Sequence, residues 1–269
     1  MRVPRSLLFV PGSRPDMVAK VPRWSPDAVA VDLEDAVAPA DKETARAAAV
    51  RAVADLPRDT GTLVLIRVNA PASPWYADDV AAVAGSAADG VVLPKLETVD
   101  QLVDLRARVG LPVVGGLETA RGVARCRELL AGGVLAAYFG AEDYIASVGG
   151  RRTAEGREVL YARSEVVLAG AIAGVGVLDQ VVVDVRDAEA FRADAAAGRD
   201  LGYDGKCCIH PSQVALAHEA FTPTDGEVGH ARRVIEAGRS GVGVVDGEMV
   251  DDVHLRMARA VLARAGVPE

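Results

Sequence analysis

Acidic and basic side chains recur directly after short apolar runs along this chain of 269 residues. These polar residues are Asp32, Glu34, Asp35, Arg67, Asn69, Lys95, Glu118, Glu142, Asp143 and His210. Two of them, Glu118 and Asp143, would hold a divalent ion and leave several of its positions to water and substrate oxygens, which suits Mg²⁺. The spacing alone equally allows Glu118 to be a first-turn helix acid and Asp143 a helix cap.

Basic side chains near the apolar runs indicate anion binding. Arg67 lies within a β-type run, where a cation is costly to desolvate unless it meets an anion. Its planar guanidinium suits a carboxylate or enolate oxygen of a substrate, and a structural salt bridge would explain it as well. After the first apolar run, Arg14 and Lys20 would hold a phosphate group, with Ser13 or backbone amides assisting, unless they are ordinary surface charges.

The elements that would position these side chains alternate regularly. A short apolar run ends in Gly, Pro or a charged residue, and a helical stretch rich in Ala, Leu, Arg and Glu follows. The predicted strands are Ser6–Pro11, Ala28–Leu33, Leu63–Val68, Gly90–Pro94, Pro112–Leu117, Leu135–Gly140, Gln180–Val185 and Lys206–His210. This alternation predicts an α/β protein with a (β/α)₈ TIM barrel, whose strands carry functional residues at their carboxyl ends. A doubly wound open sheet is the alternative.

The segment after the last predicted strand is too long to be one closing helix. We therefore expect a barrel domain over residues 1–211 and a C-terminal helical extension over residues 212–269. Helical patterns within the extension cover about Glu227–Ser240 and His254–Ala265. Such an extension would cap the barrel or pack on a neighbouring subunit.

Composition excludes several classes of protein. Half of the residues are apolar and 25% are charged, as in soluble globular proteins. A net charge of −8 with only 4% aromatic residues does not suit nucleic-acid binding. The three cysteines, Cys126, Cys207 and Cys208, do not indicate a disulfide framework. No apolar run approaches the about 18 residues of a membrane span or forms a signal peptide, so we expect a cytoplasmic protein that binds neither membrane nor nucleic acid.

Short motifs occur in one order along nearly the whole chain. They are Ser6-Leu-Leu-Phe-Val-Pro-Gly-Ser-Arg14, Asp32-Leu-Glu-Asp-Ala-Val37 with Lys42 and Arg46, Ile66-Arg-Val-Asn69, Leu93-Pro-Lys95, Leu117-Glu-Thr-Ala-Arg-Gly122, Phe139-Gly-Ala-Glu-Asp-Tyr144, Gly205-Lys-Cys-Cys-Ile-His-Pro-Ser-Gln213 and Gly247-Glu-Met-Val-Asp251. Together they resemble the citrate lyase β-subunit-like branch of the HpcH/HpaI aldolase superfamily.

The resemblance implies a TIM barrel that binds Mg²⁺ and acts on coenzyme A thioesters of hydroxy acids. Glu118 and Asp143 fall on the family's two metal ligands, and Glu118 is also expected to contact the substrate. Arg67 falls on its substrate-contacting arginine, which would be catalytic because it stabilises the charge of a thioester enolate. Glu34 and Asp35 are expected in a second layer that orients metal-bound water.

The resemblance also predicts residues for coenzyme A and for proton transfer. Phe9, Arg14 and Lys20 fall on positions that hold coenzyme A in relatives such as malyl-CoA lyase. Asp251 matches a catalytic acid that reaches into an adjacent subunit's site and would move a proton at the acyl α-carbon. Relatives commonly carry Pro where this chain has Val253, so the tail bearing Asp251 departs from the family pattern at that position.

The implied activity is a Mg²⁺-dependent carbon–carbon lyase. It would catalyse reversible Claisen-type cleavage of a 3-hydroxyacyl-CoA such as malyl-CoA or citramalyl-CoA. Alternatives are malate or citramalate synthase or thioesterase activity in the same site, a metal-dependent aldolase on free 2-oxo acids, and a non-catalytic subunit of a lyase complex. We expect a homo-oligomer because the tail needs a partner surface, and the resemblance implies a trimer or a multiple of it.

Overall fold

The computed structural model describes residues 3–238 and 242–268. The chain forms two compact units, which divide between His218 and Glu219. The first unit therefore contains the barrel expected over residues 1–211 and most of the helix that follows it. The second unit contains the rest of the C-terminal extension.

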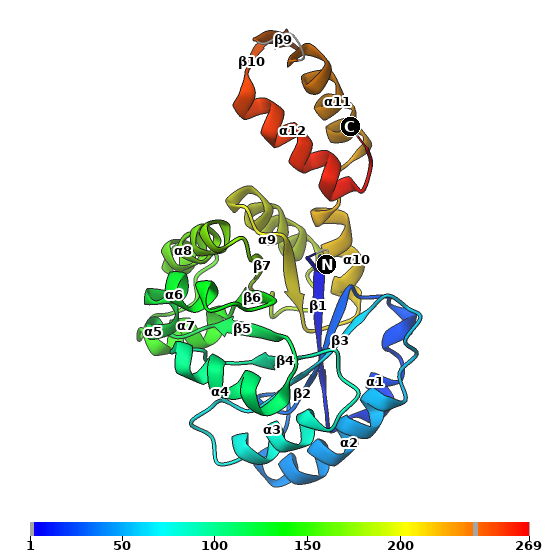
Figure 1. Cartoon of the computed structure of the whole chain (residues 1–269), viewed down its shortest axis with the longest axis vertical. Coiled ribbons are helices and arrows are strands. Elements are labelled where there is room, and N and C mark those ends of the chain that lie inside the picture. The colour runs from blue at the N-terminus through cyan, green and yellow to red at the C-terminus, as the bar shows by residue number, and fades with distance from the viewer. Residues whose placement is uncertain (1–2, 239–241, 269) are drawn as a thin grey trace. The chain divides into compact units, whose positions relative to one another are not determined.

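Eight parallel strands close into a barrel in the order of the chain (Figure 1). They are β1 (Ser6–Pro11), β2 (Ala28–Asp32), β3 (Leu63–Arg67), β4 (Gly90–Leu93), β5 (Val113–Leu117), β6 (Ala136–Phe139), β7 (Gly176–Asp179) and β8 (Gly205–Cys208). Pairing of β8 with β1, in which Leu7 lies opposite Cys207, closes the sheet. The TIM-barrel prediction is thereby confirmed, and the open doubly wound sheet is excluded.

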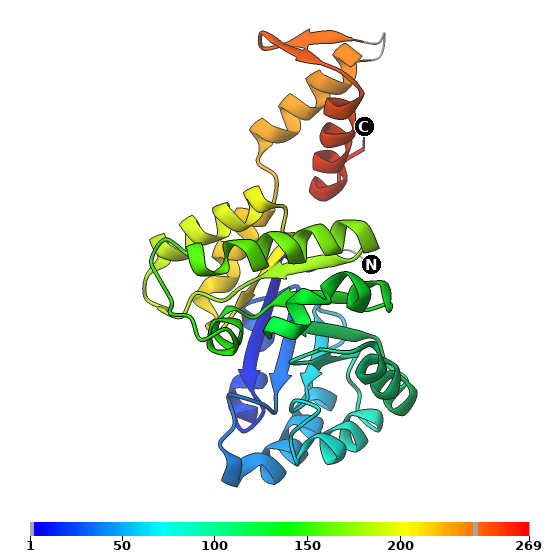
Figure 2. The ribbon, with the colours of Figure 1, turned by 90° about the vertical axis from the view of Figure 1, so that its left-hand side faces the viewer.

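The helices of the first unit lie outside the ring of strands, as Figures 1 and 2 show. They are α1 (Pro15–Val18), α2 (Lys42–Ala54), α3 (Tyr76–Ala84), α4 (Val99–Val109), α5 (Ala120–Ala124), α6 (Cys126–Ala131), α7 (Ala141–Ser147), α8 (Arg157–Ala173), α9 (Ala188–Leu201) and α10 (Ser212–Phe221), with short 3₁₀ turns η1 (Val21–Arg23) and η2 (Pro39–Asp41). Within the described ranges, no helix is both long enough and apolar enough to cross a membrane.

The prediction of the seventh strand was wrong. Gln180–Val185 is not a strand but a loop, in which Val183 is 60% exposed. The strand is the preceding β7, and its last residue, Asp179, is fully buried because Arg163 and Lys206 pair with it. In the sequence, the charged Asp179 suggests a boundary before a strand, and the three valines from Val181 to Val183 suggest the strand itself.

Side chains from alternate positions of every strand fill the barrel interior. This core contains Leu7, Ala28, Ala30, Leu65, Val92, Val114, Ala136, Tyr138, Leu178 and Cys207. Toward the carboxyl ends of the strands the interior becomes polar, with Arg67 ending β3 and Glu118 directly following β5. The sequence periodicity that builds the core therefore also directs these charged groups to one end of the barrel.

Aspartates at the amino ends of three strands have a structural role. The carboxylates of Asp27, Asp89 and Asp204, each just before a strand, accept hydrogen bonds from a backbone N–H on, or directly before, the neighbouring strand. For Asp89 the donor is Val64 N, at 2.8 Å. These contacts satisfy backbone groups that the ladder leaves unpaired, and they fix the register at this end.

The second unit is a helical hairpin with a small sheet, seen at the orange and red end of Figure 2. It contains α11 (Asp225–Gly238), β9 (Gly243–Val245), β10 (Glu248–Val250) and α12 (Asp252–Ala265). Its own core includes Ala231, Val234, Val250 and Leu262. The helix expected at Glu227–Ser240 corresponds to α11, and the last two residues of that prediction lie outside the described residues.

Candidate active site

A cavity of about 380 Å³ opens at the carboxyl ends of the barrel strands. Its lining includes Phe9, Asp32, Arg67, Glu118, Tyr138 and Asp143. The structure thus brings both predicted metal ligands and the predicted arginine to one place.

Arg67 is held by a buried carboxylate. Its Nε and Nη2 donate to the two oxygens of Asp32, each at 2.7 Å, and Nη1 lies 3.1 Å from Glu34 Oε2. Its guanidinium carbon lies 4.7 Å from the centre of the Phe9 ring. Although burial works the other way, the charge of Arg67 holds the pKa of Asp32 below its usual value. Arg67 is therefore a rigid, permanently charged group that has the structural salt bridge and also lines the cavity. Its binding of a substrate oxygen stays a prediction.

Glu118 is a buried carboxylate of the cavity, with 2% of its surface exposed. Its Oε1 accepts a hydrogen bond from the backbone N–H of Lys95 at 2.7 Å. Burial raises the pKa of Glu118, against the pull of Arg67 and Lys95. Gly140 makes room for this side chain, because a Cβ at that position would lie 2.5 Å from Glu118 Oε2. Glu118 does not lie in the first turn of a helix: it precedes Thr119, which caps α5.

Lys95 joins the carboxylates on both sides of the cavity. Its φ of 49° is in the left-handed region, and its backbone N–H donates to Glu118 Oε1. Its Nζ lies 2.7 Å from Glu34 Oε1 and 3.3 Å from Asp143 Oδ2. Asp143 lies in the first turn of α7 and lines the same cavity as Glu118, as the order of the predicted strands indicated.

Glu34 and Asp35 lie between the two cations. Glu34 is buried and pairs with Lys95 and Arg67, whereas Asp35 is exposed and lies 3.9 Å from Arg67 Nη1 and 4.0 Å from Lys95 Nζ. Burial raises the pKa of Glu34 to about 7, since the two cations offset only part of the lost hydration. Their proposed role in orienting metal-bound water stays a prediction.

The predicted coenzyme A residues lie in two different settings. Phe9 lies at the cavity, where its ring packs under Arg67 and edge-on to Tyr138. Arg14 and Lys20 are exposed after β1, and both pair with Asp16. The role of all three in binding coenzyme A stays a prediction.

Asp251 lies in the second unit, where it caps α12. Its Oδ1 accepts hydrogen bonds from the backbone N–H of Val253 at 2.9 Å and contacts His254 Nδ1 at 2.7 Å. The hydrogen bond with His254 lowers the pKa of Asp251. Its proposed catalytic role stays a prediction.

Sequence reasoning assigned no role to several residues that build the site. Asp32 and Lys95 were recognised only as charged strand ends, yet they fix Arg67 and Glu118. Tyr138 was missed, and the signal for it is the neighbouring pair Gly115-Gly116, which leaves space inside a buried strand. His210 forms a local contact with Ser212 at the start of α10 and is exposed.

The donor set fits a hard divalent cation. Glu118 and Asp143 offer carboxylate oxygens, and in the described part of the chain no three His, Cys, Asp or Glu side chains form a ready-made cage. Few protein ligands and several open positions are typical of Mg²⁺ sites. The carboxylates also outnumber the cations beside them, because Asp32, Glu34, Asp35 and Asp143 share Arg67 and Lys95.

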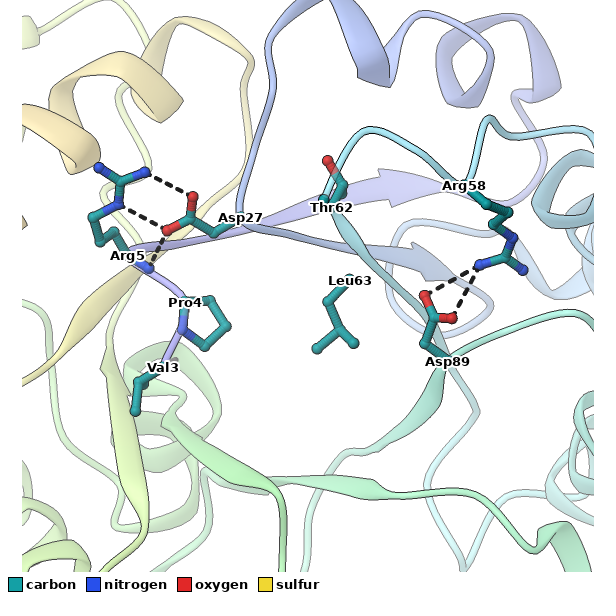
Figure 3. A pocket seen from close by; sticks show the side chains of 9 residues that line it. Val3, Pro4, Arg5, Asp27, Arg58, Thr62, Leu63 and Asp89 are labelled. Atoms are coloured by element: carbon teal, nitrogen blue, oxygen red, sulfur yellow. Dashed lines mark hydrogen bonds and ion pairs between the residues drawn. The ribbon is translucent and has the colours of Figure 1, made fainter. Parts of the chain in front are cut away.

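A second cavity, of about 480 Å³, lies at the amino ends of the strands (Figure 3). Its charged side chains face one another in pairs, Arg5 with Asp27 and Arg58 with Asp89. The same aspartates hold backbone N–H groups of neighbouring strands. This cavity is therefore lined by structural contacts, and the candidate chemistry lies at the opposite end.

Comparison with known proteins agrees with this geometry. The HpcH/HpaI aldolase/citrate lyase family model matches residues 5–211. A citrate lyase subunit beta-like protein of Deinococcus radiodurans is 47% identical over 277 residues, covering 96% of each chain. A (3S)-malyl-CoA thioesterase of Cereibacter sphaeroides is 35% identical over 97% of this chain and 94% of its own.

The whole chain also resembles a solved structure. The crystal structure of CitE from Mycobacterium tuberculosis in complex with magnesium, acetoacetate and coenzyme A matches with a TM-score of 0.86 and 36% identity, covering 97% of this chain and 98% of that one. These matches agree with the resemblance seen in the sequence motifs, and the chain belongs to the HpcH/HpaI aldolase/citrate lyase family.

Proposed function

We propose that the protein is a Mg²⁺-dependent carbon–carbon lyase that cleaves a 3-hydroxyacyl-CoA thioester, such as malyl-CoA or citramalyl-CoA, in a reversible Claisen-type reaction. The observation that carries the proposal is the buried Glu118 carboxylate, next to Asp143 and facing a cavity that also contains Arg67. The lyase relatives, and the magnesium and coenzyme A bound to the similar CitE structure, support the same class of activity.

Glu118 and Asp143 would hold the metal. When bound, Mg²⁺ supplies Lewis-acid polarisation of hydroxyl and carboxylate oxygens, which makes the substrate hydroxyl easier to deprotonate. Glu118 is kept in place by the Lys95 N–H and by the space at Gly140, so its orientation does not depend on the ligand. Lys95 and Arg67 offset part of the negative charge of the other carboxylates, Asp32, Glu34 and Asp35.

Arg67 would stabilise the charge that develops as the carbon–carbon bond breaks. The bond's electron pair passes to the thioester carbonyl and forms an enolate, and a fixed cation nearby lowers the energy of that state. Asp32 and the Phe9 ring hold the guanidinium in one orientation, so little reorganisation is needed during the reaction.

The remaining roles complete the proposed cycle. Arg14 and Lys20 would bind the phosphates of coenzyme A. Asp251 would accept the proton that the substrate hydroxyl loses and deliver it to the α-carbon of the enolate. We propose that Asp251 acts in the site of another copy within a trimer or a multiple of it. Mixing an Asp251→Ala protein with an Arg67→Lys protein would then restore part of the activity. If the two inactive variants exchange subunits and no activity returns, action in trans is contradicted.

A thioesterase is the second candidate. It is favoured by the 35% identity to a (3S)-malyl-CoA thioesterase over nearly the whole chain. Both activities would use the same metal and coenzyme A positions, and they differ in their products: a lyase releases a 2-oxo acid and an acyl-CoA, whereas a thioesterase releases free coenzyme A.

The deciding experiment assays malyl-, citramalyl- and hydroxymethylglutaryl-CoA with Mg²⁺ and with EDTA. We expect EDTA to abolish release of the oxo acid, which is a 2-oxo acid from malyl- and citramalyl-CoA and a 3-oxo acid from hydroxymethylglutaryl-CoA. Free thiol without an oxo acid would favour the thioesterase. Activity on free hydroxy or oxo acids, with no effect of coenzyme A on thermal stability, would favour the aldolase that lacks coenzyme A. Turnover unaffected by EDTA would contradict the metal-dependent proposal.

A further inference from the structure

Tyr138 carries a buried hydroxyl that the folded chain leaves unused. The residue lies on β6 inside the barrel, with 3% of its surface exposed. Its Oη is one of three buried side-chain polar atoms, among the described residues, that have no hydrogen-bond partner. Burial without a partner is unfavourable, because the hydroxyl loses its hydration and gains nothing in return.

The neighbouring strand preserves the space for this oxygen. Gly116 on β5 lies opposite Tyr138, and a Cβ at position 116 would lie 2.5 Å from Tyr138 Oη. Glycine in the interior of a strand weakens the strand, since it has the most conformational freedom to lose and no side chain to pack. Gly116 therefore accommodates the phenol at a cost to the local structure.

The residue that carries this hydroxyl lies in the wall of the candidate active site. Tyr138 lines the same cavity as Arg67 and Glu118. The oxygen Oε1 of Glu118 already accepts the Lys95 N–H. Burial, with the charge of Glu118 added, raises the pKa of Tyr138 well above its ordinary value, so the phenol keeps its proton and acts as a donor.

We propose that Tyr138 is a substrate-binding residue whose hydroxyl donates a hydrogen bond to an oxygen of the acid half of the substrate. The acceptor is the carboxylate or the adjacent oxo or hydroxyl oxygen, because Tyr138 lies inside the barrel beside the proposed metal ligand Glu118. The coenzyme A half meets other residues, on the exposed rim with Arg14. This inference rests on the proposed function.

The test compares two buried tyrosines. Tyr138→Phe keeps the ring and removes only the hydroxyl. Tyr203→Phe is the matched control, since Tyr203 is also fully buried but its Oη donates to the backbone oxygen of Arg163 at 3.0 Å. Titration calorimetry with pyruvate or glyoxylate at saturating Mg²⁺ measures binding of the acid half, and a separate titration measures coenzyme A. Thermal unfolding of the ligand-free proteins measures the structural contribution of each hydroxyl.

We expect Tyr138→Phe to bind the 2-oxo acid about 10- to 100-fold more weakly, the usual loss for a hydrogen bond to a charged group, with unchanged affinity for coenzyme A. Its melting temperature should equal or exceed that of the wild type, whereas Tyr203→Phe should melt lower and bind normally. Equal 2-oxo acid affinity in wild type and Tyr138→Phe would overturn the inference alone. Failure of the wild type to bind any 2-oxo acid with Mg²⁺ would overturn the proposed function and this inference with it.

Discussion

The two ends of the barrel use the same residue types for different purposes. At the amino ends, Asp27 and Asp89 pair with Arg5 and Arg58 and hold backbone N–H groups of the adjacent strands. At the carboxyl ends, carboxylates outnumber their cations. Two of the three buried side-chain polar atoms without a hydrogen-bond partner in the described chain also lie at this end: Tyr138 Oη, and Glu34 Oε2, whose contact with Arg67 Nη1 is an ion pair at 3.1 Å.

This difference separates stability from function within one fold. Charges that are fully matched inside the protein have little left to offer a ligand. Groups that are buried and incompletely matched reduce the stability of the free protein, and they gain when a ligand completes them. Cavity size does not distinguish the two ends, because the cavity at the amino ends is the larger one.

Removing the charge of Glu118 should have the largest effect. Glu118→Gln keeps the shape that fits beside Gly140 but weakens metal binding, so we expect turnover to fall by about 10³-fold or more. The melting temperature of the wild type should rise when Mg²⁺ is added, and that of the variant should not. Full turnover in Glu118→Gln would end the assignment of Glu118 as a metal ligand.

Removing Arg67 should affect both activity and stability. Arg67→Met leaves Asp32 as a buried carboxylate without its counter-ion, which destabilises the fold by about 3–5 kcal/mol in urea denaturation at pH 7.5. The loss should shrink at low pH, where Asp32 takes up a proton, and in the double variant with Asp32→Asn. A loss that is the same at every pH would show that the pair with Asp32 is not its cause.

Glu34 should make the free protein less stable as the pH rises. Its pKa is about 7 in the fold against an ordinary 4.5, so the folded state holds this proton more tightly than the unfolded state. The stabilisation is complete below about pH 4.5 and is lost as the pH rises through 7, up to about 3 kcal/mol. Urea denaturation without metal should show this slope in the wild type relative to Glu34→Gln, and parallel pH profiles would contradict it.

A change at the amino ends should have the smallest effect on catalysis. Asp89→Ala removes the acceptor of the Val64 N–H and the partner of Arg58, so we expect a stability loss of about 1–2 kcal/mol. The kcat and KM should stay within about twofold of the wild type. A loss of activity greater than the loss of folded protein would remove the distinction between the two ends.

Most of the barrel was predictable because buried parallel strands appear as apolar runs between helical patterns. Seven predicted strands overlap those of the structure. The seventh in chain order failed because charge at a strand end is ambiguous: Asp179 is buried in a network with Arg163 and Lys206, which only the closed barrel brings together.

The sequence predicted which residues gather at the candidate site, but not which side chains pair with one another there. Strand-end positions and motifs identified Glu118, Asp143 and Arg67. The partnership of Arg67 with Asp32 depends on the register between β2 and β3, in which these two residues lie opposite each other. The role proposed for Tyr138 depends on the missing hydrogen-bond partner of its hydroxyl in the folded state, which a sequence does not show.

Lys95 shows how this site can be adjusted in two independent ways. Its main chain holds Glu118 and its ammonium holds Glu34 and Asp143. Asparagine and glycine adopt a left-handed backbone more readily than most residues and carry no charge. Either one at position 95 would preserve the backbone hydrogen bond to Glu118 and remove the ammonium group. A single substitution at position 95 can therefore change the electrostatic potential at the opening of the active site without displacing the Glu118 carboxylate.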